Sequence, residues 1–405
     1  MKIGVVGLGY VGLVTTAVLA DQGHYVVGVD IDENKVKGLN CNRVPIYEPG
    51  LDELLAKNRE RLHFTTKYED LSDVDLAFIT VSTPTVDGRI YLGYVFSAAK
   101  SLSVIPKDSV IVVKSTVIPG TARKVKEISG REVVSNPEFL REGSAIQDTV
   151  KPDRIVIGSD SKEAGDLVER LWSFTGAPVI RTTLEEAEMI KYAANSFLAL
   201  KVSFINEIAN LCEKIPGCDA TVVAKAIGMD KRISPYFLNL GLGWGGSCFP
   251  KDTQAFVSFA KELGERLRTV EAAIEVNEER PTRLINMLKE MVGPLRGKRV
   301  CVLGVAFKPN TDDTRESRAL LVIKKLLEEG AEVVAYDPKA RTDLVRMAKT
   351  KEECIRDSEA VVIATEWQEF YGIEDLLKGK YVVDGRRVLR KELMDRRYFR
   401  AFGLG

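Results

Sequence analysis

The first 30 residues constrain the fold of this chain more than any other stretch. A short apolar strand over Lys2–Val6 runs into the turn Gly7-Leu-Gly9-Tyr-Val-Gly12, an apolar helix and a second strand over Tyr25–Val29. In such a β-α-β unit the first glycine allows the tight turn and the second lets a pyrophosphate approach the backbone. The third lets the helix pack on the strand, and the helix N-terminus faces the phosphates. The stretch therefore predicts a dinucleotide-binding, Rossmann-like domain.

The residues after the second strand indicate which dinucleotide binds. Asp30 ends the strand and can accept hydrogen bonds from both ribose hydroxyls. Ile31 and Asp32 follow it where an arginine would be needed for a 2′-phosphate, so NAD is favoured over NADP. Lys35, near the start of the next predicted helix, either approaches the adenosine end of the cofactor or is a solvated lysine.

Further strands alternate with helices, over Val74–Val81, Ser109–Val113 and Asp153–Gly158. Ligands bind at the C-terminal ends of strands in open α/β sheets. Thr83 and Thr116 lie in turns at such ends, so both are candidates to contact NAD.

Another turn follows near Ser135 and carries two acids four residues apart. If it begins a helix, Glu138 and Glu142 share one face of that helix. Acids at a helix start are also ordinary partners of the helix dipole.

Length, charge and composition exclude several classes of protein. A chain of 405 residues suggests two or three domains, and 58 basic residues balance 58 acidic ones. No net field attracts nucleic acid or an anionic membrane, and no apolar run is long enough to span a bilayer. We expect a cytoplasmic protein. The two histidines, His24 and His63, are expected at the surface, so acid–base chemistry falls to carboxylates, lysine and water.

One long helix is predicted from Thr182 to about Lys214, opened by the capping box of Thr183 and Glu186. A helix of this length usually spans domains or pairs with a copy of itself. Lys191 and Asn195 lie one turn apart on it and present a cation and an amide in a largely apolar segment. Such a pair suits oxyanion stabilisation or proton handling, although the lysine can also simply extend to solvent.

The glycine-rich stretch Gly241–Asp252 contains the candidate nucleophile. Glycine at this density lets the backbone approach a ligand closely, and Cys248 lies within it with Lys251 and Asp252 just behind. A cation beside a thiol favours the thiolate. The alternative is a flexible loop with a buried structural cysteine. The six cysteines are scattered without metal-ligand spacing, so we expect reduced thiols, no disulfide frame and no metal site.

The C-terminal third repeats the opening pattern. Strands over Arg299–Gly304, Glu332–Tyr336, Val361–Thr365 and Tyr381–Asp384 surround a helix over Ser317–Glu329. This copy lacks the glycine turn and instead carries Lys308, Arg315 and Arg387 in polar loops at strand ends, which favours a phosphate site of another kind. Surface salt bridges would also account for these cations.

The pattern predicts an α/β fold with two Rossmann-like, doubly wound parallel sheets, joined by a long central helix and a helical dimerisation region. The expected domains are an NAD-binding domain at 1–181, a central helical domain with the cysteine loop at 182–293, and a ligand-binding domain at 294–405.

Motifs spread in order over essentially the whole chain resemble the UDP-glucose/GDP-mannose dehydrogenase family. They are Gly7–Gly12, Ser82-Thr-Pro-Thr85, Lys191-Tyr-Ala-Ala-Asn195, Gly245-Gly-Ser-Cys-Phe-Pro-Lys-Asp252, Phe307-Lys308, Thr314-Arg-Glu-Ser317 and Asp384-Gly-Arg-Arg387. The segments Asn136–Ala145 and Pro152–Gly158 are similar to the branch that acts on UDP-glucose. The resemblance implies a four-electron, NAD-dependent oxidation of the sugar C6 alcohol to a carboxylate, giving UDP-glucuronate.

The resemblance also implies roles for individual residues. Cys248 would form a thiohemiacetal and then a thioester, Lys191 and Asn195 would hold the oxyanion, Asp252 and Glu138 would position or activate water, and Thr116 would help to place cofactor and water. The general base stays open among Asp252, Glu138 and Lys191. NAD would be contacted by Gly7, Gly9, Tyr10, Val11, Gly12, Asp30, Lys35, Thr83, Thr116, Glu142 and Arg315. UDP-glucose would be contacted by Glu138, Phe139, Leu140, Glu142, Lys191, Asn195, Arg232, Phe237, Leu238, Asn239, Gly241, Gly245, Phe307, Lys308 and Arg387.

Family dimers exchange an arginine near the substrate, so the resemblance implies a homodimer or higher homo-oligomer. Asn239 stands where some relatives have a lysine near the diphosphate, which affects binding strength. Other functions stay open: a dehydrogenase for GDP-mannose or another nucleotide sugar, a single-step hydroxyacid dehydrogenase in which Cys248 is structural, and a regulatory protein that binds NAD or a nucleotide sugar without turnover.

Overall fold

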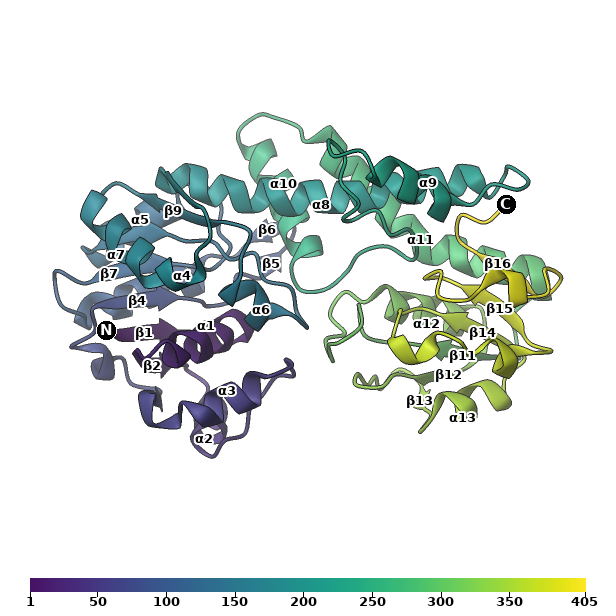
Figure 1. Cartoon of the computed structure of the whole chain (residues 1–405), viewed down its shortest axis with the longest axis horizontal. Coiled ribbons are helices and arrows are strands. Elements are labelled where there is room, and N and C mark those ends of the chain that lie inside the picture. Colours follow the sequence, from purple (N-terminus) through teal and green to yellow (C-terminus); the bar gives the residue numbers. More distant parts are fainter. The chain divides into compact units, whose positions relative to one another are not determined.

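The computed structural model describes residues 1–405, and their contacts group them into two compact units. The first unit comprises 1–194 and 254–263, and the second comprises 195–253 and 264–405. Figure 1 shows a β-sheet flanked by helices in each unit, coloured purple to teal in the first unit and green to yellow in the second. The three domains expected from the sequence stay a prediction.

The first sheet has eight strands in the order β10-β9-β8-β7-β4-β1-β2-β3. All neighbours run parallel except β8 and β9. The strands are β1 (Lys2–Val6), β2 (Tyr25–Val29), β3 (Leu62–Thr65), β4 (Leu76–Ile79), β7 (Val110–Val113), β8 (Glu132–Ser135), β9 (Ile155–Ser159) and β10 (Val179–Thr182). The order in which strands are added reverses between β1 and β4, and this is the switch point where such sheets bind ligands.

Helices cover both faces of this sheet because its central strands are apolar on both sides. In β1, Ile3 and Val5 belong to one core cluster and Val6 belongs to another. This follows from the two-residue period of a strand. Helices α1 (Tyr10–Asp21), α2 (Glu33–Asn40), α3 (Leu51–Lys57) and α7 (Lys162–Trp172) contribute to the first cluster, and α4 (Gly93–Ser101) and α5 (Thr121–Ser129) to the second.

The second sheet repeats the strand order of the first. Its six parallel strands run β13-β12-β11-β14-β15-β16, so the strand order again reverses beside the first strand, as it does for the first six strands of the larger sheet. They are β11 (Arg299–Leu303), β12 (Glu332–Tyr336), β13 (Arg346–Met347), β14 (Ala360–Ile363), β15 (Tyr381–Asp384) and β16 (Phe399–Ala401), with α12 (Arg318–Glu328) and α13 (Lys351–Arg356) between them. The predicted second Rossmann-like sheet is confirmed.

The long central helix is also confirmed as α8 (Leu184–Cys212). Its capping box forms as predicted: the Glu186 carboxylate accepts from Thr183 N at 3.0 Å, and Glu186 N donates to Thr183 Oγ1 at 3.2 Å. The other helices of this region are α9 (Ala220–Gly228), α10 (Phe249–Glu262) and α11 (Arg268–Val292). None of the helices combines the length with the apolar character that a membrane span requires.

The structure settles one open point in the first unit and adds one feature. The turn after β8 does not begin a helix at Glu138 and Glu142, because α6 starts only at Ala145 and runs to Val150. Proline at 137 and glycine at 143 interrupt the stretch between. A hairpin of β5 (Thr85–Val86) and β6 (Arg89–Ile90) was not predicted, although its Asp87-Gly88 turn, with positive φ at both residues, is a typical hairpin signal.

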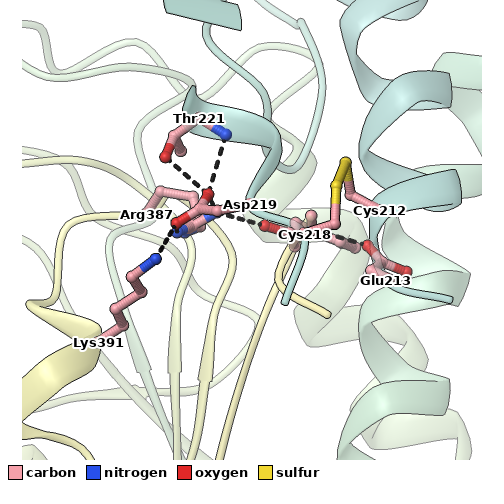
Figure 2. The surroundings of a disulfide bond; sticks show 9 residues. Cys212, Glu213, Cys218, Asp219, Thr221, Arg387 and Lys391 are labelled. Carbon is pink, nitrogen blue, oxygen red and sulfur yellow. Dashed lines mark hydrogen bonds and ion pairs between the residues drawn. A yellow bond between two sulfur atoms is a disulfide. The ribbon is translucent and has the colours of Figure 1, made fainter. Parts of the chain in front are cut away.

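The expectation of reduced thiols is wrong for four of the six cysteines. Cys212, which ends α8, is bonded to Cys218, and Cys301 on β11 is bonded to Cys354 on α13. The Cα atoms of the two pairs lie 5.0 Å and 5.4 Å apart, within the range that a disulfide spans. Figure 2 shows the first pair beside the side chains of Asp219 and Arg387. Cys212 and Cys218 lie six residues apart where the chain leaves α8. Cys301 and Cys354 are 53 residues apart and meet only because α13 packs on β11.

Candidate functional site

The glycine turn between β1 and α1 is shaped for close packing on one side and open on the other. Gly7 has a φ of 96°, and a Cβ on Gly12 would lie 1.9 Å from the Gly7 carbonyl oxygen. A Cβ on Gly9 would meet nothing within 4 Å. Gly9 is the N-cap of α1, and no side chain caps this helix end. The exposed backbone of Gly9 therefore leaves room for an anionic group at the helix N-terminus, as a bound dinucleotide requires.

A threonine that sequence analysis missed supports this turn. Thr80, directly after β4, donates through Oγ1 to the carbonyl of Gly7 at 2.7 Å. The only signal in the sequence was its place at a strand end.

Asp30 and Lys35 lie together beside the turn. The Asp30 carboxylate accepts from Leu8 N at 2.8 Å, from Asp32 N at 3.0 Å and from Lys35 Nζ at 2.9 Å. Asp30 is only 8% exposed, so few of its lone pairs face outward. Lys35 is therefore held at the carboxylate that was predicted to bind the ribose, and it is not simply a solvated lysine.

Two more predicted cofactor residues meet at the strand ends. Thr83 donates through Oγ1 to the carbonyl of Thr116 at 2.8 Å. Tyr10 contacts the carboxylate of Glu48, which also accepts from Gly143 N and Ala145 N at 2.7 Å each. Glu48 was not predicted from the sequence, and its hydrogen bonds fix the backbone next to Glu142. Val11, another predicted cofactor residue, is half-buried at the start of α1.

A buried ion pair joins Glu138 and Lys191. Lys191 Nζ lies 3.2 Å from Glu138 Oε1 and donates to the Glu138 carbonyl at 2.6 Å. Burial acts to raise the pKa of Glu138, but the charge of Lys191 and a hydrogen bond from Leu140 N outweigh it and leave the pKa below its ordinary value. Glu138 is therefore a carboxylate at neutral pH. Phe139 lies next to it, with the Arg154 guanidinium 3.6 Å from its ring centroid.

Lys114 is a second buried lysine near Glu138 that the sequence did not single out. It donates to Asn136 Oδ1 at 3.2 Å and lies 4.9 Å from the centroid of the Trp172 ring. Burial lowers its pKa to about 8. The charge of Glu138 acts in the opposite direction and helps to keep this lysine protonated.

In the second unit, Cys248 directly precedes α10 and lies one turn from Asp252, whose N–H donates to the Cys248 carbonyl at 2.8 Å. The Asp252 side chain is fully buried and accepts from Asn195 Nδ2 at 2.7 Å and from Lys251 Nζ at 2.6 Å. The cation predicted to favour the thiolate is thus paired with this carboxylate. A thiol at a helix N-terminus is nevertheless placed where the dipole favours the anion.

The segment after β11 packs against the glycines before Cys248. Gly246 has a φ of 85°, donates its N–H to the carbonyl of Arg315 at 3.1 Å, and would place a Cβ 2.6 Å from the ring of Phe307. A Cβ on Gly245 would lie 2.1 Å from the carbonyl oxygen of Glu316. Phe307, Gly245 and Gly246 are therefore brought together. Lys308 Nζ lies 5.5 Å from the Phe307 ring centroid.

The remaining predicted substrate residues of this unit are less clustered. Arg232 is exposed and paired with Asp230, Asn239 is exposed, and Leu238 is buried. The Phe237 ring centroid lies 6.0 Å from that of Phe249.

Arg387 has a protein partner that sequence analysis missed. Its guanidinium forms two 2.9 Å hydrogen bonds to the carboxylate of Asp219, which Lys391 contacts at 2.6 Å (Figure 2). Burial acts to raise the pKa of Asp219, but the two cations outweigh it and keep the pKa far below its ordinary value. The neighbouring Arg386 donates to the Gly243 carbonyl at 3.1 Å, so it is the arginine of this motif that touches the glycine-rich stretch.

The predicted catalytic residues are divided between the units. Thr116, Glu138 and Lys191 belong to the first, and Asn195, Cys248 and Asp252 belong to the second. The roles assigned to them from the sequence stay predictions.

Comparison with known proteins identifies the family. Residues 1–175 match the NAD binding domain of the UDP-glucose/GDP-mannose dehydrogenase family, residues 185–279 its central domain, and residues 301–391 its UDP binding domain. The chain is 43% identical to a UDP-glucose 6-dehydrogenase of Haloferax volcanii, over 98% of this chain and 99% of that protein. It is 44% identical to one from Bacillus subtilis, over 97% and 90% of the two chains.

Solved structures agree with these matches. A UDP-glucose dehydrogenase of Pyrobaculum islandicum superposes with a TM-score of 0.91 at 43% identity, covering 96% of this chain and 94% of that one. A UDP-D-ManNAc dehydrogenase of Pyrococcus horikoshii superposes with a TM-score of 0.90 at 29% identity, covering 100% and 99%.

The match to the NAD binding domain confirms NAD as the cofactor, and the open turn at Gly9 fits it. The resemblance of the sequence motifs is likewise confirmed: the chain belongs to the UDP-glucose/GDP-mannose dehydrogenase family.

Proposed function

We propose that this enzyme oxidises UDP-glucose to UDP-glucuronate by covalent catalysis through Cys248. The observation that carries the proposal is the position of Cys248 at the N-terminus of α10, one turn from a fully buried Asp252 that Asn195 and Lys251 hold. Identities above 40% to proteins named UDP-glucose 6-dehydrogenase support the choice of substrate.

NAD supplies the hydride acceptor for both oxidations. In the first oxidation, the C6 hydroxyl becomes an aldehyde and loses its proton. Glu138 is ionised and is therefore a candidate acceptor for that proton, directly or through water. Asp252 and Lys191 remain the alternative bases. Lys191 and Asn195 are proposed to donate hydrogen bonds to the oxygen as its negative charge develops.

In the second oxidation, the Cys248 thiolate adds to the aldehyde carbon and forms a C–S bond. Loss of hydride from this thiohemiacetal gives a thioester. Water then attacks the thioester carbon, the C–S bond breaks, and Cys248 leaves as the thiolate. Each sugar thus consumes two NAD and one water and yields a carboxylate, two NADH and three protons.

The proposal predicts two NADH for each UDP-glucose consumed when the purified protein is given excess NAD and limiting sugar, with UDP-glucuronate as the product. One NADH for each sugar would instead indicate a single-step dehydrogenase with a structural Cys248. A yield of two with GDP-mannose and none with UDP-glucose would keep the chemistry and change the substrate.

Replacing Cys248 tests the covalent step separately. Cys248→Ser should retain binding of UDP-glucose but lose steady turnover by roughly 1,000-fold or more, since a serine hydroxyl is a poor nucleophile without a paired base. Calorimetric titration and a stopped-flow NADH trace would measure the two quantities. Full steady turnover by this variant would refute the covalent mechanism.

We further propose that α8 pairs with a second copy of the chain. Three large apolar side chains, Phe197, Phe204 and Leu211, repeat every seven residues along α8 and are 62%, 49% and 62% exposed. A heptad of exposed apolar residues on a long helix is typical of a helix-pairing surface. Phe197→Asp combined with Phe204→Asp should convert a dimer to a monomer in analytical ultracentrifugation, whereas a dimer that survives both changes would refute this interface.

A further inference from the structure

The backbone N–H and C=O groups of the four residues Gly241–Trp244, which we call the buried glycine segment, need hydrogen-bond partners that regular secondary structure does not supply. All four are buried, yet they belong to no helix or strand. Buried backbone N–H and C=O groups without partners cost free energy, and here no regular ladder supplies partners. The segment lies a few residues before Cys248, so whatever fixes it also limits where the thiol can be.

Side chains from two helices supply the missing partners. On α8, Asn206 Oδ1 accepts from Gly241 N at 2.8 Å. On α11, Asn277 accepts from Trp244 N and donates to the Trp244 carbonyl, both at 2.8 Å. Asn206 and Asn277 are fully buried. Gly243 has a φ of 103°, and a Cβ there would lie 2.3 Å from Asn277 Oδ1, so the fit leaves no room for another residue.

Arg280 holds the same segment from α11, one turn beyond Asn277. Its Nε donates to the Gly241 carbonyl at 2.8 Å, its Nη1 donates to Asn210 Oδ1 at 2.6 Å, and its guanidinium lies 3.9 Å from the ring centroid of Phe402. Its hydrogen-bond acceptors are two carbonyl oxygens and one amide oxygen, with no carboxylate among them.

Burying Arg280 in this way makes the free energy of folding less favourable. The side chain is 0% exposed, Nη2 has no hydrogen-bond partner, and burial lowers the pKa of Arg280 to about 9. Burying a cation without a bonded carboxylate lowers the stability of the folded state, and a well-packed apolar side chain of similar volume is often more stabilising. The contribution of Arg280 to stability therefore does not explain its presence, whereas its bond to the carbonyl of Gly241 places a fixed donor on the glycine-rich stretch.

We propose that Arg280, Asn206 and Asn277 are positioning residues. They hold the backbone that leads to Cys248 in the geometry needed for addition of the thiol to the aldehyde. This rests on the proposed covalent function of Cys248. The three side chains act through the loop, and the chemical step they serve is the second oxidation. NAD binding, which the first unit supplies, should not depend on them.

The test compares Arg280→Lys and Asn206→Leu with Ser358→Ala as a control. Ser358 donates a buried hydrogen bond to the Cys354 carbonyl in the same unit, away from the glycine segment. Arg280→Lys keeps the charge but cannot reproduce the directed Nε–H bond. Asn206→Leu keeps the volume and removes the acceptor for Gly241 N. The two variants act from different helices, so a folding failure of one leaves the other informative.

The first readout needs no turnover. The rate of alkylation of Cys248 by iodoacetamide is followed by peptide mass spectrometry, with the exposed Cys41 as the reference in the same molecule. The rate ratio of Cys248 to Cys41 should fall at least about threefold in both variants and stay unchanged in Ser358→Ala, because small displacements strongly affect reactivity. A ratio equal to that of the unaltered protein in both variants would overturn the inference.

The second readout separates the two oxidations. In stopped-flow experiments with saturating UDP-glucose, which removes any effect on sugar binding through Gly241, the variants should release the first NADH at the original rate. The second should be released about tenfold more slowly or worse, with KM for NAD within about twofold. A variant that merely folds less well would lower both phases by the same fraction, and that result would also overturn the inference. If the unaltered protein forms no NADH from any nucleotide sugar, the proposed function fails, while the alkylation ratio still tests the role of Arg280.

Discussion

The two sheets place matching residues at matching positions and use them differently. Gly7 follows β1 with a φ of 96°, and Gly304 follows β11 with a φ of 98°. Each donates to the last carbonyl of the neighbouring strand, at 2.8 Å and 2.7 Å. Thr80, the first residue after β4, bonds the Gly7 carbonyl at 2.7 Å. Thr365, the second residue after β14, bonds the carbonyl of Ala306, two residues beyond Gly304, at 2.7 Å. The backbone frame of a nucleotide turn is present in both.

The acids at the ends of β2 and β12 show the difference. Asp30 is 8% exposed and bonds two backbone N–H groups and Lys35. Asp337 is 0% exposed and accepts from Val305, Ala306, Lys339 and Ala340 N–H groups and from Trp367 Nε1. Its lone pairs are used by the protein, so no ligand hydroxyl can reach them. One turn is kept for a ligand, and its duplicate has become structural.

The helix that follows each turn also suits ligand binding in the first sheet and not in the second. In the first sheet α1 begins at Tyr10, directly after the exposed Gly9. In the second, Ala306 is fully buried and an irregular stretch separates it from α12. No helix N-terminus follows the turn closely enough to receive a pyrophosphate there. The second sheet therefore matches a UDP binding domain without a dinucleotide turn of its own.

The largest effect should come from filling the first turn. Gly12→Val would drive a side chain into the Gly7 carbonyl, which is 1.9 Å from the Cβ position. We expect kcat/KM for NAD to fall by about 100-fold or more, because the turn can no longer bring α1 against β1. In the second sheet, Ala306→Gly should change kcat/KM for NAD by less than about twofold, since no cofactor binds there. Equal losses in both variants, measured by initial rates, would break the comparison.

The two acids should separate binding from stability. Asp30→Asn should raise KM for NAD about tenfold, the cost of one charged hydrogen bond, and should destabilise the protein less than Asp337→Asn, because Asp30 accepts from fewer backbone N–H groups. Asp337→Asn should lower the free energy of unfolding by about 2 to 4 kcal/mol and leave KM for NAD unchanged, because its N–H partners lose a buried carboxylate. Urea unfolding and NAD titration would measure both. A raised KM for NAD in Asp337→Asn would show that the duplicate turn still serves the cofactor.

A smaller, pH-dependent effect is expected from Glu188. This buried side chain on α8 accepts from Gly120 N at 2.7 Å and from Ala122 N at 2.6 Å at the start of α5, and burial raises its pKa to about 7. The folded state then holds a proton that the unfolded state releases near pH 4.5, so stability falls as pH rises from about 4.5 to 7.

Glu188→Gln should remove that slope, so that its stability relative to the unaltered protein is higher at pH 8 than at pH 5 by about 2 kcal/mol. In the second sheet, burial likewise raises the pKa of Asp384, which accepts from Arg386 N and Leu389 N after β15. The dependence of stability on pH that remains in Glu188→Gln measures the contribution of the other groups with a raised pKa, such as Asp384. Thermal unfolding at several pH values gives both, and an unchanged slope would contradict the assignment to Glu188.

Much of the fold could be predicted because its signals are local. The turn at Gly7–Gly12, the capping box at Thr183 and Glu186, and the repeated strand rhythm after Lys298 depend on residues a few positions apart. Backbone conformation, capping and apolar periodicity act over such distances, so they are visible in one sequence. The family resemblance rested on the same kind of short motif. Whether a helix begins at Glu138 was left open, because acids four apart are a weak helix signal when proline and glycine flank them.

By itself, then, the sequence determined the two sheets, the long helix and the cofactor, and it named candidate catalytic residues. Only the tertiary structure decided which of them meet. It paired Arg387 with Asp219, joined Cys301 to Cys354, and placed Asn277 and Arg280 on the glycines before Cys248. Such contacts link residues distant along the chain. They are set by how helices and sheets pack to bury apolar area and satisfy buried polar groups, and that sum over the whole fold leaves no local mark in the sequence.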